Sequence, residues 1–374
     1  MGCKVDDSYV VSGAAPTNRY LNLCDATDDC EVYVSTLDGY ISPSRAERWY
    51  AVRLIREKFP HLDAQTIAYR LRFSTFVSME HKILYVETPK AGCSTIKYIL
   101  RDALGAPPID FPVGSLWESR RDMFVHTRSN VPLPSLIDLD DALQRHVLTS
   151  PDFLRFCVVR NPYSRLISAW RNKIVFCEPG YEYVYKAIIG NAPPIHGKQI
   201  LDFEKFLEYV EKEPNLAICN PHWRRQVDLL FESAIPYNHI GRLERLSETI
   251  SILGSYIPTV RQMRAEARNQ SFSHDGGSDL GERIASRIFE LYKADFIAYG
   301  YAENSWVNVA GFEIKNSPVP YSRLLDEVTE RNMVLSILYE RYRQLQSRHD
   351  NAYRYSMRRI QNVVAKVFRR LLRA

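Results

Sequence analysis

The chain has 374 residues, of which 45% are hydrophobic and 25% are charged, and these proportions are typical of a soluble globular protein. The net charge of +5 is uneven: residues 349–374 carry seven Lys or Arg and one acid, a balance of +6 that leaves −1 for the rest. A near-neutral body without zinc-ligand spacing or a basic-aromatic stacking pattern argues against nucleic acid as a partner. The length suits one large α/β domain with extensions.

Cysteine usage and hydropathy predict the redox compartment of the chain and whether it spans a membrane. The seven cysteines are dispersed and form no Cys-x-x-Cys pair, which favours a reducing compartment, although Cys24 and Cys30 could pair outside one. No apolar stretch reaches the length of about eighteen residues that a transmembrane helix needs. The N-terminus has no basic-then-apolar signal peptide. We therefore expect neither an anchor nor a leader.

The N-terminal part is expected to be an arm followed by a helical extension, together residues 1–79. Residues 1–30 are polar and show little periodicity. A helical region is predicted to begin after Ser42, a favourable N-cap, with Pro43 as its first helical residue. The pattern continues to about Phe76.

A strand, a loop and a helix follow. The apolar run Ile83–Val86 predicts a buried strand of a parallel sheet, and Ser94–Leu104 predicts a helix with Ser94 as its N-cap. A helix that begins here directs backbone amides and the positive end of its dipole toward the loop, which suits an anion. Gly92 allows close approach of the backbone to such an anion, and Lys90 adds a positive charge.

Residues 106–134 separate this loop from a second one and are a candidate wall of the site for an acceptor substrate. They contain His126 and Arg128. The second loop follows the apolar run 156–159: Arg160 ends the strand, and a helix is expected to include Ser168. If the loop folds back over its helix, the guanidinium of Arg160 and the hydroxyl of Ser168 can meet on one phosphate.

The remaining part of the core is predicted from shorter patterns. Residues 178–200 contain several Gly and Pro and predict a long surface loop of the kind that often binds ligands. A further strand is expected at His239–Gly241. Helices are expected at residues 202–213, 244–256 and 281–296.

Beyond residue 302 the composition changes, and residues 303–374 are predicted to be a helical C-terminal extension. The last helix places aliphatic residues on one face and arginines on the other. Basic amphipathic helices suit an anionic membrane surface or a partner helix. The alternative is a helix that packs its apolar face on its own domain.

The two loops, in this order, resemble the carbohydrate sulfotransferases of the HNK-1 and chondroitin/dermatan 4-O-sulfotransferase type. The resemblance covers residues 80–302, which we take as the catalytic domain, and implies a three-layer α/β, P-loop-like core with a parallel sheet. It implies PAPS (3′-phosphoadenosine 5′-phosphosulfate) as cofactor, with PAP as product. The motifs that carry it are Glu87–Thr95, Val158–Trp170, Asn220–Gln226, Ile240–Glu244, and Tyr292–Phe296 with Gly300 and Tyr301.

The resemblance also implies which residues bind the cofactor. The 5′-phosphosulfate is expected at Lys90, Ala91, Gly92, Cys93, Ser94 and Thr95. The 3′-phosphate is expected at Arg160 and Ser168. Three positions depart from the family pattern: Cys93 and Ser94 stand where many sulfotransferases have Thr, and Arg225 stands where the His-Trp patch usually has Pro. These departures affect the acceptor contacts more than the cofactor assignment.

Such an enzyme moves a sulfuryl group in line onto a hydroxyl of a carbohydrate or glycoconjugate. Lys90 is the candidate that neutralises charge on the leaving phosphate. A sugar hydroxyl needs a general base, and His126 is the first candidate and His222 the second, because the pKa of His lies near the working pH. His222, Arg224 and Arg128 are candidate acceptor contacts. The scheme requires no metal, and we expect none.

The sequence leaves two alternative functions open and predicts a cellular location. The first alternative is an ATP-dependent phosphotransferase, which is disfavoured because Lys90 precedes Gly92 and the loop is therefore not a Walker A motif. The second is a non-catalytic protein with a degenerate nucleotide site that contacts a membrane or a partner through its tail. Animal members of the resembled family usually carry a signal anchor and work in the Golgi lumen. Because this chain shows no anchor, we expect a bacterial-type cytoplasmic enzyme, with peripheral contact to the inner membrane through the C-terminal helix.

Overall fold

The computed structural model describes residues 41–107, 125–126, 130–175, 178, 180–189, 203–263 and 281–309. The chain divides into two compact units, one of residues 1–159 and 217–266 and the other of residues 160–216 and 267–374. The predicted N-terminal arm, Arg128 and the predicted C-terminal helices lie outside the described residues.

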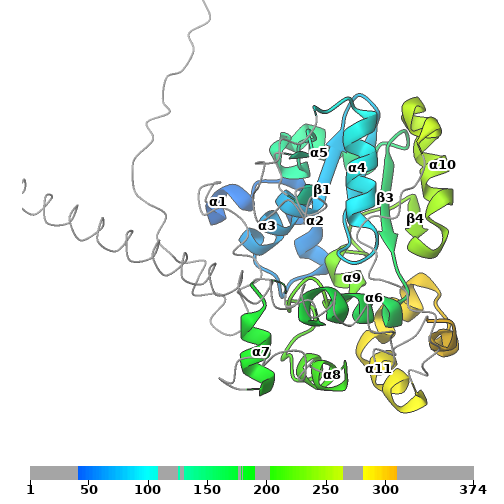
Figure 1. Ribbon diagram of the computed structural model, residues 1–374. Helices are drawn as coiled ribbons and strands as arrows, with labels where there is room; N and C mark the ends of the chain where they lie inside the picture. The colour runs from blue at the N-terminus through cyan, green and yellow to red at the C-terminus, as the bar shows by residue number, and fades with distance from the viewer. Residues whose placement is uncertain are drawn as a thin grey trace, which may run out of the picture. The chain divides into compact units, whose positions relative to one another are not determined.

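The first unit contains a mixed, mostly parallel sheet in the order β1-β2-β3-β4 (Figure 1). Its strands are β1 (Thr75–Ser78), β2 (Ile83–Val86), β3 (Leu154–Val159) and β4 (His239–Arg242). The strands β2, β3 and β4 are parallel neighbours, and β1 pairs antiparallel with β2. The predicted α/β class and the predicted strands are therefore confirmed. The helical prediction up to Phe76 was wrong, because that residue lies within β1.

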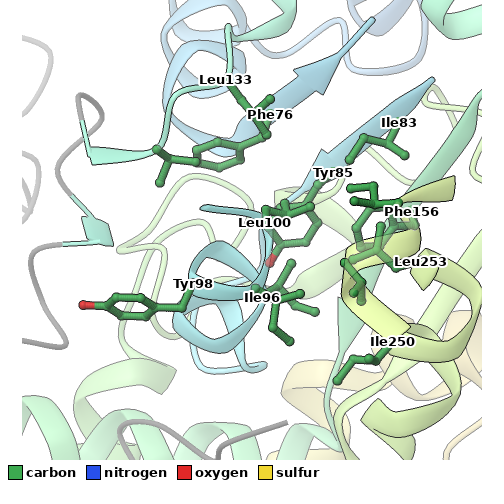
Figure 2. Close-up of a cluster of buried hydrophobic side chains, with 14 of the residues drawn as sticks. Phe76, Ile83, Tyr85, Ile96, Tyr98, Leu100, Leu133, Phe156, Ile250 and Leu253 are labelled. Atoms are coloured by element: carbon green, nitrogen blue, oxygen red, sulfur yellow. The ribbon is translucent and has the colours of Figure 1, made fainter. Parts of the chain in front are cut away.

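Both faces of the sheet are covered by other layers. Every side chain of β1, β2 and β3 is buried, and consecutive side chains point to opposite faces. On one face, Phe76, Tyr85 and Phe156 lie in register across three strands, and their rings stack with centroids 5.9 and 5.0 Å apart. Figure 2 shows α4 (Cys93–Ala103) and α10 (Leu246–Tyr256) covering these rings with Ile96, Leu100, Ile250 and Leu253.

Helices before the sheet begin where the sequence offers caps. The helix α1 (Pro43–Ala46) starts after Ser42, whose hydroxyl accepts from the amide of Arg45 at 3.3 Å, as predicted. The cap of α3 is Asp63, which accepts from the amide of Thr66 at 2.8 Å. The other helices of the first unit are α2 (Tyr50–Lys58), α3 (Ala64–Ser74), α5 (Asp141–Thr149) and α9 (Gln226–Leu229), with 3-10 turns η4 (Leu136–Asp138), η6 (Leu243–Arg245) and η7 (Pro258–Gln262).

The second unit, among its described residues, is helical. Its elements are α6 (Pro162–Ala169), the π-helix η5 (Trp170–Val175), α7 (Glu182–Ile189), α8 (Phe203–Glu211), α11 (Glu282–Tyr299) and the 3-10 helix η8 (Glu303–Asn308). The ring of Tyr163 on α6 packs 4.8 Å from that of Phe296 on α11, and its hydroxyl donates to the carbonyl of Glu303 at 2.6 Å. Burial raises the pKa of Tyr163 to about 12, so this hydroxyl remains a donor.

Three predicted helices are confirmed as α8, α10 and α11, and one predicted loop was wrong. Residues 178–200 were predicted to be a surface loop, but α7 occupies Glu182–Ile189. The glycines flank this helix, whereas Val184 within it and Tyr181 just before it are buried. The packing of α7 on α8 outweighs the loop signal of the flanking glycines.

Candidate active site

The loop between β2 and α4 ends in a glycine cap. Gly92 is the N-cap of α4 and has φ 80°, in the left-handed region, and no side chain caps the helix. The helix therefore starts at Cys93, and the prediction of Ser94 as the cap was wrong. The first amides of an α-helix have no acceptor within the helix, so α4 directs donors and a partial positive charge toward the loop.

The backbone of this loop is tightly constrained. Lys90 also has a positive φ, 68°, which is uncommon for a residue with a side chain. A Cβ atom added at Gly92 would lie 2.8 Å from Cδ1 of Leu243, below any ordinary contact. The loop is thus closed by a turn, in which the amide of Ala91 donates to the carbonyl of Thr88 at 3.2 Å, and it is packed directly against η6.

Buried hydroxyls surround the cap. Ser94 and Thr95 are 6% and 5% exposed in the first turn of α4. The side chain of Thr88 is buried, and its Oγ1 has no hydrogen-bond partner in the part of the chain that the structure describes. A buried hydroxyl without a partner is costly. A phosphate oxygen at the start of α4 is the kind of group that would satisfy it, so the loop residues fit an anionic ligand.

A chain of polar contacts links the cap to His126. Nε2 of His126 lies 2.9 Å from Oγ of Ser94, and Nδ1 lies 2.8 Å from Nζ of Lys97, one turn further along α4. Nζ of Lys97 is also 2.7 Å from Oε2 of Glu87, an ion pair that lacks hydrogen-bond alignment. We call these four residues, Glu87, Lys97, His126 and Ser94, the polar chain of α4.

The segment that carries His126 is fixed to α4 and to the core. The guanidinium of Arg101 donates from Nε to the carbonyl of Asn130 at 3.1 Å. Val125 and Val131, on either side of His126 in the sequence, are buried in the cluster shown in part in Figure 2. The position of the imidazole is therefore determined by helix α4 and its packing.

The contacts of His126 bear on its predicted role as the general base. An ammonium group has donors only, so Nδ1 must accept from Lys97, and the ring proton of the neutral imidazole is then on Nε2. Nε2 consequently donates to Ser94. With a hydroxyl at Nε2 and an ammonium at Nδ1, both ring nitrogens of His126 have partners in this structure.

His222 has the opposite tautomer. Oδ1 of Asn220 lies 3.0 Å from Nδ1 of His222 and accepts from its backbone amide, also at 3.0 Å. The backbone amide can only donate, which identifies its partner atom as the carbonyl oxygen of Asn220. The neutral imidazole then donates to this oxygen from Nδ1 and has its lone pair on Nε2. His222 is half-buried.

Arg224, predicted to bind the acceptor, makes two hydrogen bonds to backbone carbonyls. Its side chain is buried, Nε donates to the carbonyl of Cys219 at 2.7 Å, and Nη2 donates to that of Ile218 at 3.0 Å. These bonds stabilise the turn that precedes α9. Arg225, which stands where the resembled family has Pro, pairs with Asp228 at 2.6 Å.

Arg160, in the second unit, contacts a serine that the sequence analysis did not select. Its Nε donates to Oγ of Ser164 at 2.9 Å, and Ser164 in turn donates to the carbonyl of Asn161 at 3.1 Å. Ser168 is buried one turn further along α6, on the same face as Ser164. The spacing of four residues was the signal that could have identified Ser164.

The thiol of Cys93 stays neutral in the cap of α4. The side chain is 7% exposed, and burial, the largest effect, raises the pKa of the thiol above its ordinary value. The nearby ammonium of Lys97 acts in the opposite direction but does not outweigh burial. Cys93 can therefore offer its backbone amide to a ligand but not a thiolate.

Comparison with known proteins agrees with this architecture. Residues 73–302 match the model of the sulfotransferase family, and the chain belongs to that family. Carbohydrate sulfotransferase 10 of Xenopus laevis is 30% identical over 258 residues, which are 62% of this chain and 68% of the relative. Human carbohydrate sulfotransferase 9 is 25% identical over 60% of this chain and 52% of its own length. Carbohydrate sulfotransferase 14 of Danio rerio is 27% identical over 60% of this chain and 61% of its own length.

These relatives overturn the predicted location. They are animal enzymes, the group for which the family resemblance implied the Golgi lumen, so the prediction of a bacterial-type cytoplasmic enzyme was wrong. None of the helices among the described residues is long and apolar enough to cross a membrane. The predicted membrane contact of the C-terminal helix lies outside those residues. No solved structure matches the chain.

Proposed function

We propose that the chain transfers the sulfuryl group of PAPS to a hydroxyl of a carbohydrate or glycoconjugate. The observation that carries the proposal is the loop at the start of α4, with its capping glycine, its lysine and the buried, unpartnered hydroxyl of Thr88. It lies in a chain of the sulfotransferase family whose relatives are carbohydrate sulfotransferases. PAPS supplies the group that is transferred, and the protein holds the two substrates and handles charge and protons.

The residues of the loop bind the 5′ end of the cofactor in this proposal. The backbone amides from Ala91 to Thr95 and the hydroxyls of Ser94 and Thr95 donate to phosphate and sulfate oxygens. Lys90 lies half-buried at the same loop and neutralises charge that builds up on the leaving phosphate oxygen. Preorganised donors of this kind stabilise a transition state without reorganisation.

The 3′-phosphate is assigned to the start of α6. Arg160 can present its guanidinium to a phosphate while Ser164 holds Nε, because a guanidinium has five donors. The hydroxyl of Ser168 is a second donor on the same helix face. The proposal thus keeps both predicted residues and adds Ser164 as the group that orients the arginine.

The general base in this proposal is His222. Its tautomer places the lone pair on Nε2, whereas that of His126 places a proton there. His222 accepts the proton of the acceptor hydroxyl, and the bond from Nδ1 to Asn220 stabilises the imidazolium that results. This assignment reverses the order of the two candidates in the sequence analysis. Arg128 stays a candidate for acidic groups of the acceptor.

The scheme uses no metal. Among the described residues, no group of three or more His, Cys, Asp or Glu is arranged to hold a metal ion. Lys90 and the amides of α4 instead neutralise the charge on the transferred group. The proposal therefore predicts cofactor binding that does not depend on Mg²⁺.

Calorimetric titration with PAP, in the presence and absence of Mg²⁺ and beside ATP, tests the proposal. PAP binding in the micromolar range that ignores Mg²⁺ and exceeds ATP binding is expected. Tighter binding of Mg-ATP would favour the phosphotransferase alternative, and binding of neither nucleotide by folded protein would favour a non-catalytic role. Acceptors are then identified by incubating candidate glycans with labelled PAPS and measuring label transfer.

A further inference from the structure

We propose that Asn161 and Ser305 are positioning residues, which orient the guanidinium of Arg160 toward the 3′-phosphate of the cofactor and so strengthen the selectivity for that phosphate. This inference deepens the proposed function and rests on it. Ser305 lies beyond residues 73–302, which match the sulfotransferase family, and no motif of the sequence analysis selected it. The contacts between the start of α6 and η8 identify both residues.

The 3-10 helix η8 is bonded to the start of α6 through two side chains. The hydroxyl of Tyr163 donates to the carbonyl of Glu303 at 2.6 Å. Nδ2 of Asn161 donates to Oγ of Ser305 at 2.8 Å. Tyr163 and Asn161 are 1% and 8% exposed, so both bonds lie in a region of low dielectric, where they are stronger than in water. All four residues belong to the second unit.

The direction of each bond around Asn161 follows from a group that can act in only one way. The backbone amide of Tyr163 donates to one side-chain atom of Asn161 at 3.0 Å, which identifies that atom as Oδ1. The other atom is therefore Nδ2, a donor, and Oγ of Ser305 accepts from it. The hydroxyl of Ser305 donates its own proton to the carbonyl of Ala302 at 2.5 Å. No ionisable group takes part, so these contacts do not depend on a protonation state.

The same asparagine positions the hydroxyl that holds Arg160. The carbonyl of Asn161 accepts from Oγ of Ser164 at 3.1 Å. A lone pair of that hydroxyl in turn accepts from Nε of Arg160 at 2.9 Å. Because Nε is engaged, bidentate contacts to a phosphate fall to the two terminal nitrogens of the guanidinium. A rotation of residue 161 would therefore move Ser164 and change the direction in which Arg160 presents these nitrogens.

The side chain of Asn161 does more than cap α6. Its Oδ1 accepts from the amide of Tyr163, which is the capping bond, and Asp or Ser would cap the helix as well. Of these capping residues, only Asn has an amide group that also donates to Ser305. Capping does not explain this second bond, and it is the bond that ties the conformation of the loop at Arg160 to η8.

Two nucleotides that differ by one phosphate measure the selectivity. PAP carries the 3′-phosphate and adenosine 5′-monophosphate (AMP) lacks it, and both are titrated calorimetrically into the full chain. Ser305→Ala should bind PAP roughly 3- to 10-fold more weakly, the effect of one hydrogen bond, and AMP within about twofold of wild type. Asn161→Ser, which keeps a cap for α6 but loses the amide donor, should show the same selective loss. Ser305→Thr retains the hydroxyl and should restore PAP binding.

Ser255→Ala is the matched control. The hydroxyl of Ser255 donates to the carbonyl of Ile252, three residues earlier, at 2.6 Å. Ser305 donates to Ala302 in the same way, but Ser255 lies on α10 of the first unit. Removal of the Ser255 hydroxyl should therefore leave the affinities for both nucleotides unchanged.

The outcomes separate this inference from the proposed function. Wild-type protein that binds no PAP, or binds PAP no better than AMP, would refute the assignment of the 3′-phosphate to Arg160. A wild-type preference for PAP that persists in Ser305→Ala and in Asn161→Ser would overturn the inference alone. Equal loss of PAP and AMP affinity in these variants would indicate a general structural role and would also overturn it. If Ser305→Ala does not fold, Asn161→Ser decides the question, because its cap preserves α6.

Discussion

Gly92→Ala tests whether the cap of α4 is as constrained as the structure shows. Two effects add at this position. A residue with a Cβ in the left-handed region costs about 1–2 kcal/mol, and the new methyl group would lie 2.8 Å from Cδ1 of Leu243. Overpacking of this kind costs roughly 1–3 kcal/mol, less if the leucine side chain can move. We expect a loss of about 2–4 kcal/mol in the free energy of unfolding.

Gly105→Ala is the matched control, because it isolates the first effect. Gly105 has φ 66°, but a Cβ there would meet nothing within 4 Å. Its substitution should cost only about 1–2 kcal/mol. The assay is urea unfolding followed by the fluorescence of tryptophan, since Trp223 is fully buried in the same unit. Equal stability of the two variants would show that the loop does not pack on Leu243, and the argument for a closed cap would fail.

Three further predictions concern chemistry rather than the cap. Arg160→Ala should weaken PAP binding by roughly 1.5–3 kcal/mol through loss of charged hydrogen bonds. An unchanged PAP affinity in calorimetric titration would show that Arg160 does not bind the cofactor. His222→Gln should lower kcat by about 10²- to 10⁴-fold with PAP affinity retained. A near-normal rate would mean that another residue is the general base. Because burial raises the pKa of Cys93, its thiol should resist iodoacetamide at pH 8 in folded protein, and rapid labelling in peptide maps would contradict the burial.

Local sequence patterns correctly predicted the central parallel strands of the sheet. The runs that became β2 and β3 are short, wholly apolar and followed by turn residues, which is the pattern of strands buried on both faces. The strand β1 was missed because Thr75–Ser78 continues a helical stretch without a break, and only its pairing with β2 makes it a strand. The pairing joins residues that the local pattern cannot connect.

The site was predicted less completely, for a related reason. A lysine in the middle of a helix is usually a solvated residue, so the pattern of α4 gave no reason to select Lys97. Lys97 is nevertheless buried near the ring of Phe76 from β1, and it contacts Glu87 and His126 from two other segments. The histidine was selected as the candidate base, and its contact with Ser94 places it beside the loop. The proton positions on its ring could only follow from its neighbours.

Lys90 allows strain and function to be separated in one residue. Its φ of 68° places a side chain in the left-handed region, at a cost of about 1–2 kcal/mol that a glycine would not bear. Lys90→Gly should therefore stabilise the protein by up to about 1 kcal/mol, because the greater entropy of an unfolded glycine offsets part of the gain. The same variant should lower turnover strongly, since the charge at the leaving phosphate is lost.

Lys90→Ala distinguishes these two contributions. It removes the charge but retains the Cβ in the left-handed region, so its turnover should fall as far as that of Lys90→Gly while its stability stays near that of the wild type. Urea unfolding and the rate of label transfer from PAPS measure the two effects on the same preparations. If Lys90→Gly were no more stable than Lys90→Ala, the backbone at residue 90 would not be strained. Greater stability of Lys90→Gly together with its loss of turnover would mean that the strained conformation at residue 90 is retained for function and not for folding.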